Sequence, residues 1–488
     1  MSKDIQRNLL PLAASLREAL ALLNQGVSGA VFLVDGAGML CGLFTDGDIR
    51  RALLAGAALD DDAVRWMNRK FTSGRASASH EENLRLLSKS IRHLPILDDA
   101  GRPVEFLSWA EIWKLPVTQP SLGGNELKYV SDCIATSWIS SQGSYVTQFE
   151  QAFADFHSVP AALTVSNGTT ALHLVLVALG IGPGDEVIVP DLTFAASANV
   201  VIHCGATPVL ADVDAQTWTL DPADFARKVT LRTKAVMPVH LYGHPCDMDP
   251  IMEIARQHGL FVVEDCAEAL GAKYKGRLVG TFGDAGCFSF FANKVITTGE
   301  GGMVFAANRE LHHRMHVLRD HGMEKGRRYW HIHPGFNYLM TNIQAAIGLA
   351  QMERIDFFLD RHREIARHYT ERLRGLPGIV LPPEESWAAN IYWLYSILID
   401  ETRAGLGRDQ LARWLADHGV ETRQLFYPLH IQPPYPKAAD AEFPISTQLS
   451  ARGLSLPTSK DLEPAQIDRV CDAIEQAVTA QPLAAASR

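Results

Sequence analysis

The chain has 488 residues, which is long enough for two or three hydrophobic cores. Of these residues, 47% are hydrophobic and 20% are charged, a composition typical of a globular protein. Its formal net charge of -10 argues against a general nucleic-acid binder, because binding to phosphates needs a basic face. The sequence shows neither a run of about 18 apolar residues nor the apolar core of a signal peptide, so we expect a cytoplasmic protein without membrane partners.

Residues 1 to about 115 contain an internal repeat that aligns without gaps. Residues 34–49 (VDGAGMLCGLFTDGDI) lie over residues 97–112 (LDDAGRPVEFLSWAEI). Each copy predicts a strand, an Asp/Gly turn, a second strand and a helix, with Thr45 or Ser108 as the helix N-cap. We therefore assign residues 1–115 to a domain made of two copies of one α/β unit.

This repeat resembles a tandem pair of cystathionine-β-synthase (CBS) domains. The resemblance implies an adenine nucleotide between the two copies, with Thr45 and Asp48 of a Thr-x-x-Asp motif holding its ribose and phosphate. The second copy departs from the motif, because Ser108 and Glu111 stand there. Helix capping alone also explains Thr or Ser at these positions, and the pair is then a docking or dimerisation element. The sequence leaves both interpretations open.

After a short linker at residues 115–120, apolar strands alternate with helices. One helix starts after Asp221 with Pro222 at its first position. The alternation predicts a mainly parallel sheet covered on both faces, in a large domain at residues 119–355. A long helix over residues 355–373 introduces a smaller C-terminal α+β subdomain at 356–481. Strands are predicted at residues 161–165, 186–190, 208–213, 234–240 and 260–264.

Three features of the large domain point to one kind of cofactor. Residues 162–172 run from a strand through a small-residue turn into a helix, whose first N–H groups form a seat for phosphate. Residues 261–268 predict a buried strand that brings Asp265 to its end, where open α/β sheets bind ligands. Lys294 follows another apolar run. A lysine amine, a strand-end aspartate and a phosphate seat are together what pyridoxal 5'-phosphate requires.

Five motifs follow one another along this part of the chain. They are Ser-Asn-Gly-Thr-Thr at 166–170, Pro-Asp-Leu-Thr-Phe at 190–194, Glu-Asp-Cys-Ala-Glu at 264–268, Ser-Phe-Phe-Ala-Asn-Lys at 289–294, and Gly-Phe-Asn-Tyr at 335–338 with the run at 340–346. Their order resembles the DegT/DnrJ/EryC1/StrS family of sugar aminotransferases, over about residues 119–480. The resemblance implies the fold type I architecture of aspartate aminotransferase, pyridoxal 5'-phosphate as cofactor, and keto sugars linked to nucleotides as substrates.

The resemblance gives each site residue a role. Lys294 bonds to the cofactor and, once released, moves the proton of the amino donor, while Asp265 pairs with the ring nitrogen. Phe194 stacks on the ring. Asn337 reaches the phosphate from a neighbouring subunit, which implies a homodimer or a larger homo-oligomer. The phosphate is bound by Gly168, Thr169, Thr170 and Ser289.

Two residues depart from the family pattern. Glu268 takes the place of a glutamine or histidine beside the cofactor's phenolic oxygen, where a carboxylate must be protonated or compensated. Leu339 takes the place of an arginine, so one positive charge near the phosphate is missing. Substrate contacts are expected from two further segments that resemble the family, through Trp138, Ser140, Tyr427 and His430.

The favoured function is amination of a nucleotide-linked keto-deoxysugar, with glutamate as the amino donor. Residues 328–330 and 426–435 look most like those of perosamine synthases, which implies GDP-4-keto-6-deoxymannose as substrate and C4 as the aminated carbon. Sugar dehydratases of the same fold replace the lysine by histidine, so Lys294 argues against that alternative. A nucleotide-sensing regulator on a retired enzyme scaffold is the other alternative. The intact Lys294, Asp265 and phosphate seat argue against it.

We expect no metal site. His331 and His333 have a suitable spacing, but no acidic or cysteine partner stands nearby in the sequence. The seven cysteines occur singly, without a Cys-x-x-Cys pair, which argues against a zinc knuckle and a disulfide framework.

Overall fold

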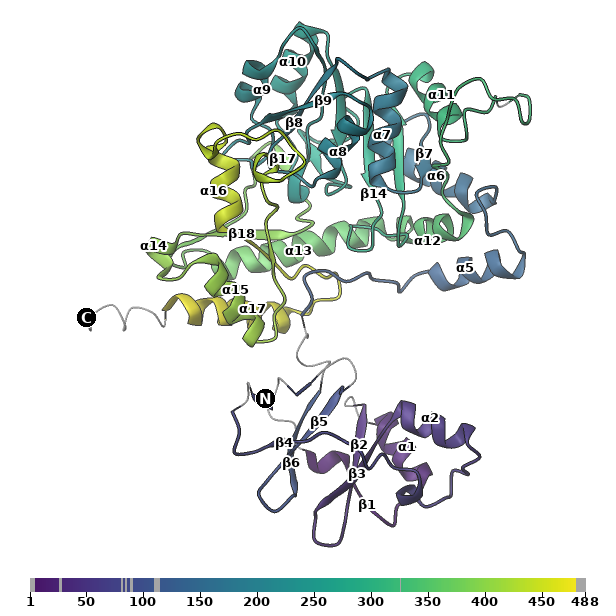
Figure 1. The fold of residues 1–488 in the computed structure, drawn as a ribbon, viewed down its shortest axis with the longest axis vertical. Coiled ribbons are helices and arrows are strands. Elements are labelled where there is room, and N and C mark those ends of the chain that lie inside the picture. The colour runs from purple at the N-terminus through teal and green to yellow at the C-terminus, as the bar shows by residue number, and fades with distance from the viewer. Residues whose placement is uncertain are drawn as a thin grey trace. The chain divides into compact units, whose positions relative to one another are not determined.

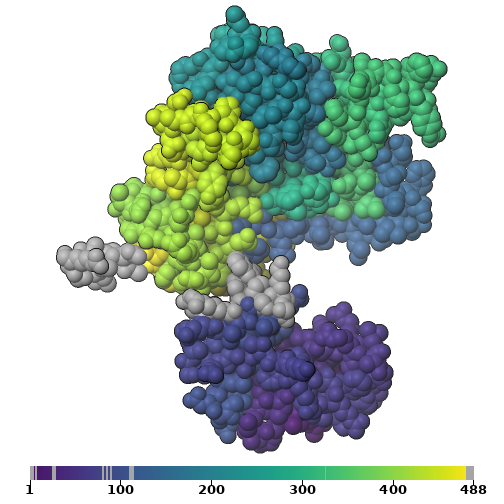
Figure 2. Space-filling model, viewed as in Figure 1, coloured from purple at the N-terminus to yellow at the C-terminus, as the bar shows by residue number. Residues whose placement is uncertain are grey.

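The computed structural model describes residues 5–25, 29–79, 82–83, 86–87, 91–108, 115–324 and 326–479. The chain divides into two compact units, residues 1–114 and 115–488, and each is described by itself. Both are drawn as ribbons in Figure 1 and in space-filling form in Figure 2. Over the described ranges, every helix is too short or too polar to cross a membrane.

The first unit contains two three-stranded sheets with the same strand pairing. In each sheet the first strand pairs parallel with the second, and the second pairs antiparallel with the third. Helices α1 (Leu16–Gln25) and α2 (Asp46–Leu54) contribute to the core of the first sheet. The strands are β1 (Leu9–Pro11), β2 (Ala30–Val34) and β3 (Leu40–Thr45), then β4 (Gly74–Arg75), β5 (His93–Leu97) and β6 (Pro103–Ser108).

The two hairpins of this unit also repeat each other in their turns. Asp35 and Asp98 each accept hydrogen bonds from the N–H groups two and four residues further on, at 2.8–2.9 Å. Both hairpins shift register at the last residue of their first strand, which is Val34 in β2 and Leu97 in β5. The sequence repeat thus corresponds to a structural one up to Ser108. The helix expected after Ser108, with Glu111, lies outside the described residues.

The second unit is built around a seven-stranded sheet with the order β7-β15-β14-β11-β10-β8-β9. All its strands are parallel except β15, which is antiparallel to both of its neighbours. Along β8, Val187 and Val189 pack in one core while Ile188 packs in another, so both faces of the sheet are covered. The strands are β7 (Leu163–Val165), β8 (Glu186–Pro190), β9 (Thr207–Ala211), β10 (Thr233–Val236), β11 (Phe261–Asp265), β14 (Ala285–Ser289) and β15 (Gly302–Ala306).

The predicted α/β fold class with a mainly parallel sheet is confirmed. β8 occupies the predicted residues 186–190, and α9 (Pro222–Lys228) begins after Asp221, whose carboxylate accepts the N–H groups of Ala223 and Asp224. β10 was predicted to reach residue 240 but ends at Val236. Pro238 has no N–H to donate to a ladder, which explains the early end of the strand.

The C-terminal part forms a four-stranded antiparallel sheet with the order β16-β18-β20-β19. Helix α13 (Ile355–Leu373) fills the predicted range and packs against α17 (Pro464–Thr479). After β19 the chain returns to the seven-stranded sheet, where the N–H of His430 donates to Asp191 beyond the end of β8; Figure 2 shows this segment as yellow atoms against teal ones. The strands are β16 (Ile379–Val380), β18 (Tyr395–Ile399), β19 (Arg423–Gln424) and β20 (Gly453–Leu456).

The remaining elements of the second unit connect these sheets. Figure 1 shows α7 and α8 beside the large sheet and α13 crossing near the ends of its strands. The remaining helices and short strands are α5 (Glu126–Ala135), α6 (Ser144–His157), α7 (Gly168–Leu179), α8 (Ala196–His203), α10 (Met248–His258), α11 (Arg309–Leu318), α12 (Asn342–Met352), α14 (Glu401–Ala404), α15 (Arg408–Asp417), α16 (Pro444–Arg452), α17 (Pro464–Thr479), β12 (Lys273–Tyr274), β13 (Arg277–Leu278) and β17 (Ala388–Ala389).

Candidate active site

The candidate site lies at the carboxyl edge of two neighbouring parallel strands, β11 and β14. Their register pairs Asp265, the last residue of β11, with Cys287, so Ser289 at the end of β14 lies at the same edge. Lys294 follows five residues later in the loop between β14 and β15. This is the edge at which open α/β sheets bind ligands, because parallel strands all end there.

The Lys294 amine is held between a carboxylate and an aromatic ring. Its Nζ lies 3.4 Å from Oε1 of Glu268 and 3.7 Å from the ring centroid of Trp393. The side chain is only 13% exposed. Burial lowers the pKa of the Lys294 amine, although the negative charges of Glu268 and Asp265 oppose that shift. An amine of this kind can exchange a proton closer to neutral pH than an exposed lysine.

The negative charge of the Glu268 carboxylate is compensated by the Lys294 amine and by a main-chain N–H group. Its second carboxylate oxygen accepts the N–H of Tyr242 at 3.0 Å. Burial raises the pKa of Glu268, and the Lys294 charge opposes the rise. The ring of Tyr242 is stacked with those of Trp393 and Phe426, at centroid distances of 6.4 and 5.4 Å. These three aromatic residues form a cluster next to Lys294, which the sequence did not reveal.

Asp265 is buried and fixed by two donors. The hydroxyl of Ser197 donates to Oδ2 at 2.9 Å, and the N–H of Ala267 donates to Oδ1 at 3.1 Å. Ser197 in turn lies 3.1 Å from the hydroxyl of Thr193. Burial raises the pKa of Asp265, and these two donors oppose the rise. Ser197 was missed in the sequence, although it stands in the helix that directly follows Phe194.

The predicted phosphate seat is the N-terminus of α7. Asn167 caps the helix by accepting the N–H of Thr170 at 2.9 Å, so the N–H groups of Gly168 and Thr169 remain without an intrahelical acceptor. The Thr170 hydroxyl donates to the carbonyl of Asn167 at 2.8 Å and therefore takes part in the cap. A Cβ on Gly168 would lie 2.7 Å from Cβ of Ser289, so glycine lets α7 approach the end of β14.

Three other predicted residues lie on the surface. Phe194 is 59% exposed and its ring lies 5.8 Å from that of Phe426. Asn337 is exposed, and its main chain pairs with Asp320. Tyr427 follows Phe426 and is 53% exposed. These positions leave the side chains of Phe194, Asn337 and Tyr427 accessible to a ligand or a second subunit.

The loop that contains Trp138 and Ser140 is fastened to the start of α12. The side chain and the N–H of Asn342 donate to the carbonyls of Trp138 and Ser140, at 2.7 and 2.9 Å. A Cβ on Gly143 would collide with Asn342. The indole of Trp138 is 58% exposed, so the loop is fixed through its main chain while its side chains stay accessible.

The structure contradicts the predicted sugar contact of His430. The side chain is fully buried and both ring nitrogens face carboxylates, Asp191 at 2.7 Å and Asp440 at 3.2 Å. The ring also stacks on Phe443 at 4.8 Å. His430 thus fastens the segment after β19 to the end of β8, and the sequence could not show this because Asp191 lies 239 residues away.

Another group of potential metal ligands is buried behind the site. Ligand atoms of His240, Glu264 and Cys266 all lie within 4.8 Å of one another. The N–H of Cys246 donates to Nδ1 of His240 at 3.0 Å, so the proton of this ring is on Nε2, which lies 3.1 Å from Glu264. Glu264 also accepts three main-chain N–H groups at 2.6–2.7 Å. The acceptor positions of Glu264 and His240 are filled, and the group is a structural hydrogen-bond network.

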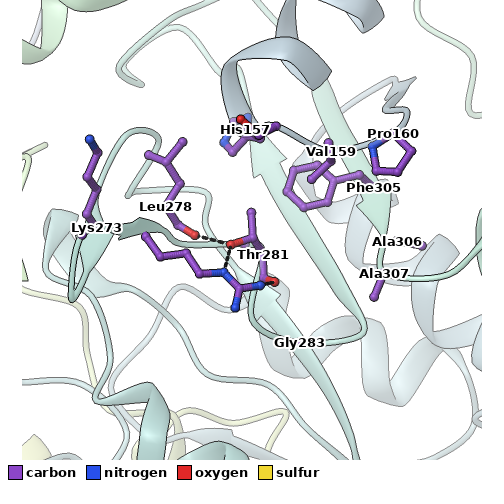
Figure 3. A pocket seen from close by; sticks show the side chains of 14 residues that line it. His157, Val159, Pro160, Lys273, Leu278, Thr281, Gly283, Phe305, Ala306 and Ala307 are labelled. Atoms are coloured by element: carbon purple, nitrogen blue, oxygen red, sulfur yellow. Dashed lines mark hydrogen bonds between the residues drawn. The ribbon is translucent and has the colours of Figure 1, made fainter.

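A separate cavity of about 530 Å³ lies at the opposite end of β14. Figure 3 shows His157, Pro160 and Phe305 on one side of it, and Lys273, Leu278 and Thr281 on the other. Gly283, which lines it, precedes β14, whereas Lys294 follows the end of that strand. None of the residues that line this cavity belongs to the site of Lys294 and Asp265.

The predicted nucleotide residues of the first unit contact each other. Oδ2 of Asp48 accepts both the N–H and the hydroxyl of Thr45, at 2.9 and 2.6 Å, which makes a capping box at the start of α2. Oδ1 of Asp48 pairs with Arg51. A hollow of about 470 Å³ beside them is lined by Asp48, Arg51, Ala52, Trp66 and Asn68.

Comparison with known proteins agrees with this geometry. The profile of the DegT/DnrJ/EryC1/StrS aminotransferase family matches residues 120–475, and that of the CBS domain matches residues 1–55. The chain belongs to the DegT/DnrJ/EryC1/StrS aminotransferase family. The predicted family, fold type I architecture and enzyme class are thereby confirmed. The CBS match covers the first copy of the repeat.

Relatives within this family cover most of the chain. The GDP-perosamine synthases of Caulobacter vibrioides and Escherichia coli O157:H7 are 50% and 49% identical over 370 and 362 residues, which is 75% and 74% of this chain and 99% and 98% of theirs. Among solved structures, DesV of S. venezuelae has a TM-score of 0.69 at 35% identity, over 73% of this chain and 94% of that one. The pyridoxal 5'-phosphate form of the sugar aminotransferase Spr1654 from Streptococcus pneumoniae has a TM-score of 0.71 at 27% identity, over 75% and 99%.

Proposed function

We propose that this aminotransferase holds pyridoxal 5'-phosphate at the carboxyl edge of β11 and β14 and transfers the amino group of glutamate to a nucleotide-linked keto-deoxysugar. Two relatives at 50% and 49% identity are GDP-perosamine synthases. On that basis we take GDP-4-keto-6-deoxymannose as the substrate and its C4 as the aminated carbon. The observation that carries the proposal is the buried Lys294 amine, held between Glu268 and Trp393 at a strand edge beside Asp265.

The residues at this edge fit the cofactor. The N–H groups of Gly168 and Thr169 and the hydroxyl of Ser289 would bind its phosphate, since a helix N-terminus attracts anions. Asp265 would pair with the ring nitrogen through the acceptor positions that Ser197 and Ala267 leave open. The exposed ring of Phe194 would stack on the cofactor ring. Once bound, pyridoxal 5'-phosphate supplies an electron sink and a carrier for the amino group.

Lys294 is the group that moves protons in this proposal. Burial lowers its pKa, so the neutral amine forms at a lower pH than in an exposed lysine, and in that form it can accept the α-proton of the amino donor and return it. Glu268 lies within reach of Nζ, and its other oxygen is fixed by the N–H of Tyr242. Glu268 therefore orients the amine and raises its affinity for a proton.

We also propose that the working form is a homodimer or a larger homo-oligomer. Asn337 is exposed, so a second copy can receive its side chain. Helix α5 and the loop after it expose large apolar side chains, among them Leu127, Ile134 and Trp138 at 80%, 63% and 58%. Analytical ultracentrifugation tests this proposal, and a monomer that is active at assay concentration would contradict it.

For the first unit we propose a tandem CBS pair over residues 1–115 that binds an adenine nucleotide beside Thr45 and Asp48. The match to residues 1–55 and the hollow next to Asp48 support the proposal. The large and small domains of the enzyme are assigned to residues 119–355 and 356–481. Calorimetric titration with AMP and ATP tests the nucleotide site, and an absence of binding to the full chain leaves a docking role for the pair.

The decisive experiment follows the absorbance of the purified protein with pyridoxal 5'-phosphate. Wild type is expected to form a visible band that glutamate bleaches, whereas Lys294→Ala forms none. The nucleotide sugar is then supplied, and the mass of the product is measured.

Each outcome separates one alternative. A wild type that forms no band with excess cofactor would favour a regulator on an enzyme scaffold. A product that has lost a hydroxyl without gaining nitrogen would indicate a dehydratase. A band that glutamate bleaches, followed by amination of a different keto sugar, would correct the substrate alone.

A further inference from the structure

A second buried lysine, Lys460, contacts the loop that carries Lys294. It follows strand β20 and is only 4% exposed. Its Nζ donates to the main-chain carbonyl of Val295 at 2.7 Å and to that of Lys294 at 3.4 Å. Both acceptors belong to the turn between β14 and β15, so this ammonium contacts the main chain of the proposed catalytic residue.

We propose that Lys460 is a positioning residue, which holds the main chain at Lys294 and Val295 and thereby sets the point from which the Lys294 side chain enters the site. The inference rests on the proposed function, because it concerns how Lys294 meets its cofactor. Trp393 acts together with Lys460, since its Nε1 donates to the carbonyl of Asn293 at 2.6 Å. Three successive carbonyls are therefore held by side chains of the C-terminal part.

The surroundings of Lys460 point to positioning rather than to stability. Among the described residues its ammonium has no ion pair with a carboxylate, and the ring of Phe358 on α13 lies 4.7 Å from Nζ. Burial lowers the pKa of Lys460 to about 8, with Asp461 opposing and Arg354 adding to the shift. A buried charge without an ionic partner contributes little to stability, so an apolar residue would serve a purely structural role better.

The other polar groups near Lys460 do not change the contacts of its ammonium with the carbonyls of Lys294 and Val295. The Arg361 guanidinium on α13 donates to the main-chain carbonyl of Lys460 at 3.0 Å and fixes the residue itself. His362 on α13 stays uncharged, because burial lowers its pKa to about 3. With a pKa of about 8, Lys460 is mostly protonated at pH 7, and its N–H groups point at the carbonyls of Val295 and Lys294.

The test measures how fast the apo-protein captures pyridoxal 5'-phosphate, per folded molecule, together with kcat and KM of the holoenzyme. Lys460→Met removes both hydrogen bonds and is expected to slow capture and lower kcat on the order of tenfold or more, with KM for the sugar substrate little changed. Lys460→Arg keeps a charged donor and should restore part of the loss. Lys437→Met is the matched control, because the exposed Lys437 also donates to a main-chain carbonyl, that of Ile431, at 2.9 Å.

The outcomes separate this inference from the proposed function. No capture by wild type overturns the proposed function and this inference with it. Normal capture by wild type and equally fast capture by Lys460→Met overturn this inference alone. If Lys460→Met does not fold, Lys460→Gln takes its place, since glutamine can reach one carbonyl without a charge. Slow capture by folded Lys460→Gln supports the positioning role, and capture at the wild-type rate overturns it.

Discussion

Two helix N-termini in this chain look alike in the sequence and differ in their surroundings. Helix α7 begins after Asn167 and α2 after Thr45, and each forms a capping box. The first turn of α7 has no acidic residue, whereas that of α2 contains Asp46 and Asp48. At α7 two N–H groups stay open towards the edge of the large sheet. At α2 the Asp48 carboxylate takes up both donors of Thr45.

This difference decides which ligand each helix start suits. A helix N-terminus attracts anions through its dipole and its open N–H groups. The start of α7 is therefore ready for a phosphate. At α2 the charges of Asp46 and Asp48 in the first turn oppose the binding of a phosphate there.

Removal of the amine next to α7 is expected to have the largest effect on activity. Lys294→Ala should lower the rate of amination by at least about 10³-fold, since it removes both the cofactor attachment and the proton carrier. Lys275→Ala, which removes an exposed lysine of the same domain, should leave the rate unchanged. Initial rates of 2-oxoglutarate formation measure both variants. A Lys294→Ala variant that keeps a tenth of wild-type activity would contradict the assignment of Lys294 as the catalytic residue.

Replacement of Gly168 by alanine at the start of α7 is expected to have the next largest effect, on stability and on cofactor binding. Gly168→Ala should destabilise the fold by about 1–3 kcal/mol and weaken cofactor binding, because the new Cβ meets Cβ of Ser289 at 2.7 Å. Gly182→Ala is the control, since its Cβ would have no neighbour closer than 3.8 Å. Thermal unfolding and fluorescence titration with cofactor measure the two effects. Equal stability and affinity in both variants would contradict the close approach of α7 to β14.

A change of charge beside Lys294 is expected to move a pH profile. Capture of pyridoxal 5'-phosphate by the apo-protein needs the neutral amine, so its rate rises with pH through the pKa of Lys294. The Glu268 charge raises that pKa, and Glu268→Gln should therefore move the midpoint to lower pH. The capture rate is measured from pH 6 to 10. An unchanged midpoint would show that Glu268 is already protonated in the native protein.

The capping box of α2 is expected to have the smallest effect. Thr45→Ala should lower the stability of the first unit by about 1 kcal/mol and leave the rate of amination unchanged, because it removes a cap far from Lys294 in the sequence. Asn167→Ala, the matching change at α7, should cost about as much stability and also weaken cofactor binding. Thermal unfolding and cofactor titration compare the two. Weaker cofactor binding in Thr45→Ala would contradict the contrast between the helices.

Local patterns were enough to predict much of the fold. Buried strands such as residues 186–190 and the helix at 355–373 follow from the spacing of apolar residues and from Gly and Pro at the ends. Asp265 could be placed at the sheet edge because parallel strands end together. The family followed from motifs around Lys294 and Asp265, and the comparisons confirmed it. The roles of the single site residues stay predictions that the variants above test.

Contacts between distant segments were decided only by the tertiary structure. His430 looked like a sugar contact next to Tyr427, yet Asp191 holds its buried ring. Trp393 and Lys460 donate hydrogen bonds to the Lys294 turn, although 100 and 165 residues separate them from their acceptors. Nothing in the sequence marked either position. Helix and strand patterns arise from interactions between near neighbours, which the sequence displays directly. The partner of a buried polar group depends on how the packed elements come together, and only the folded chain shows it.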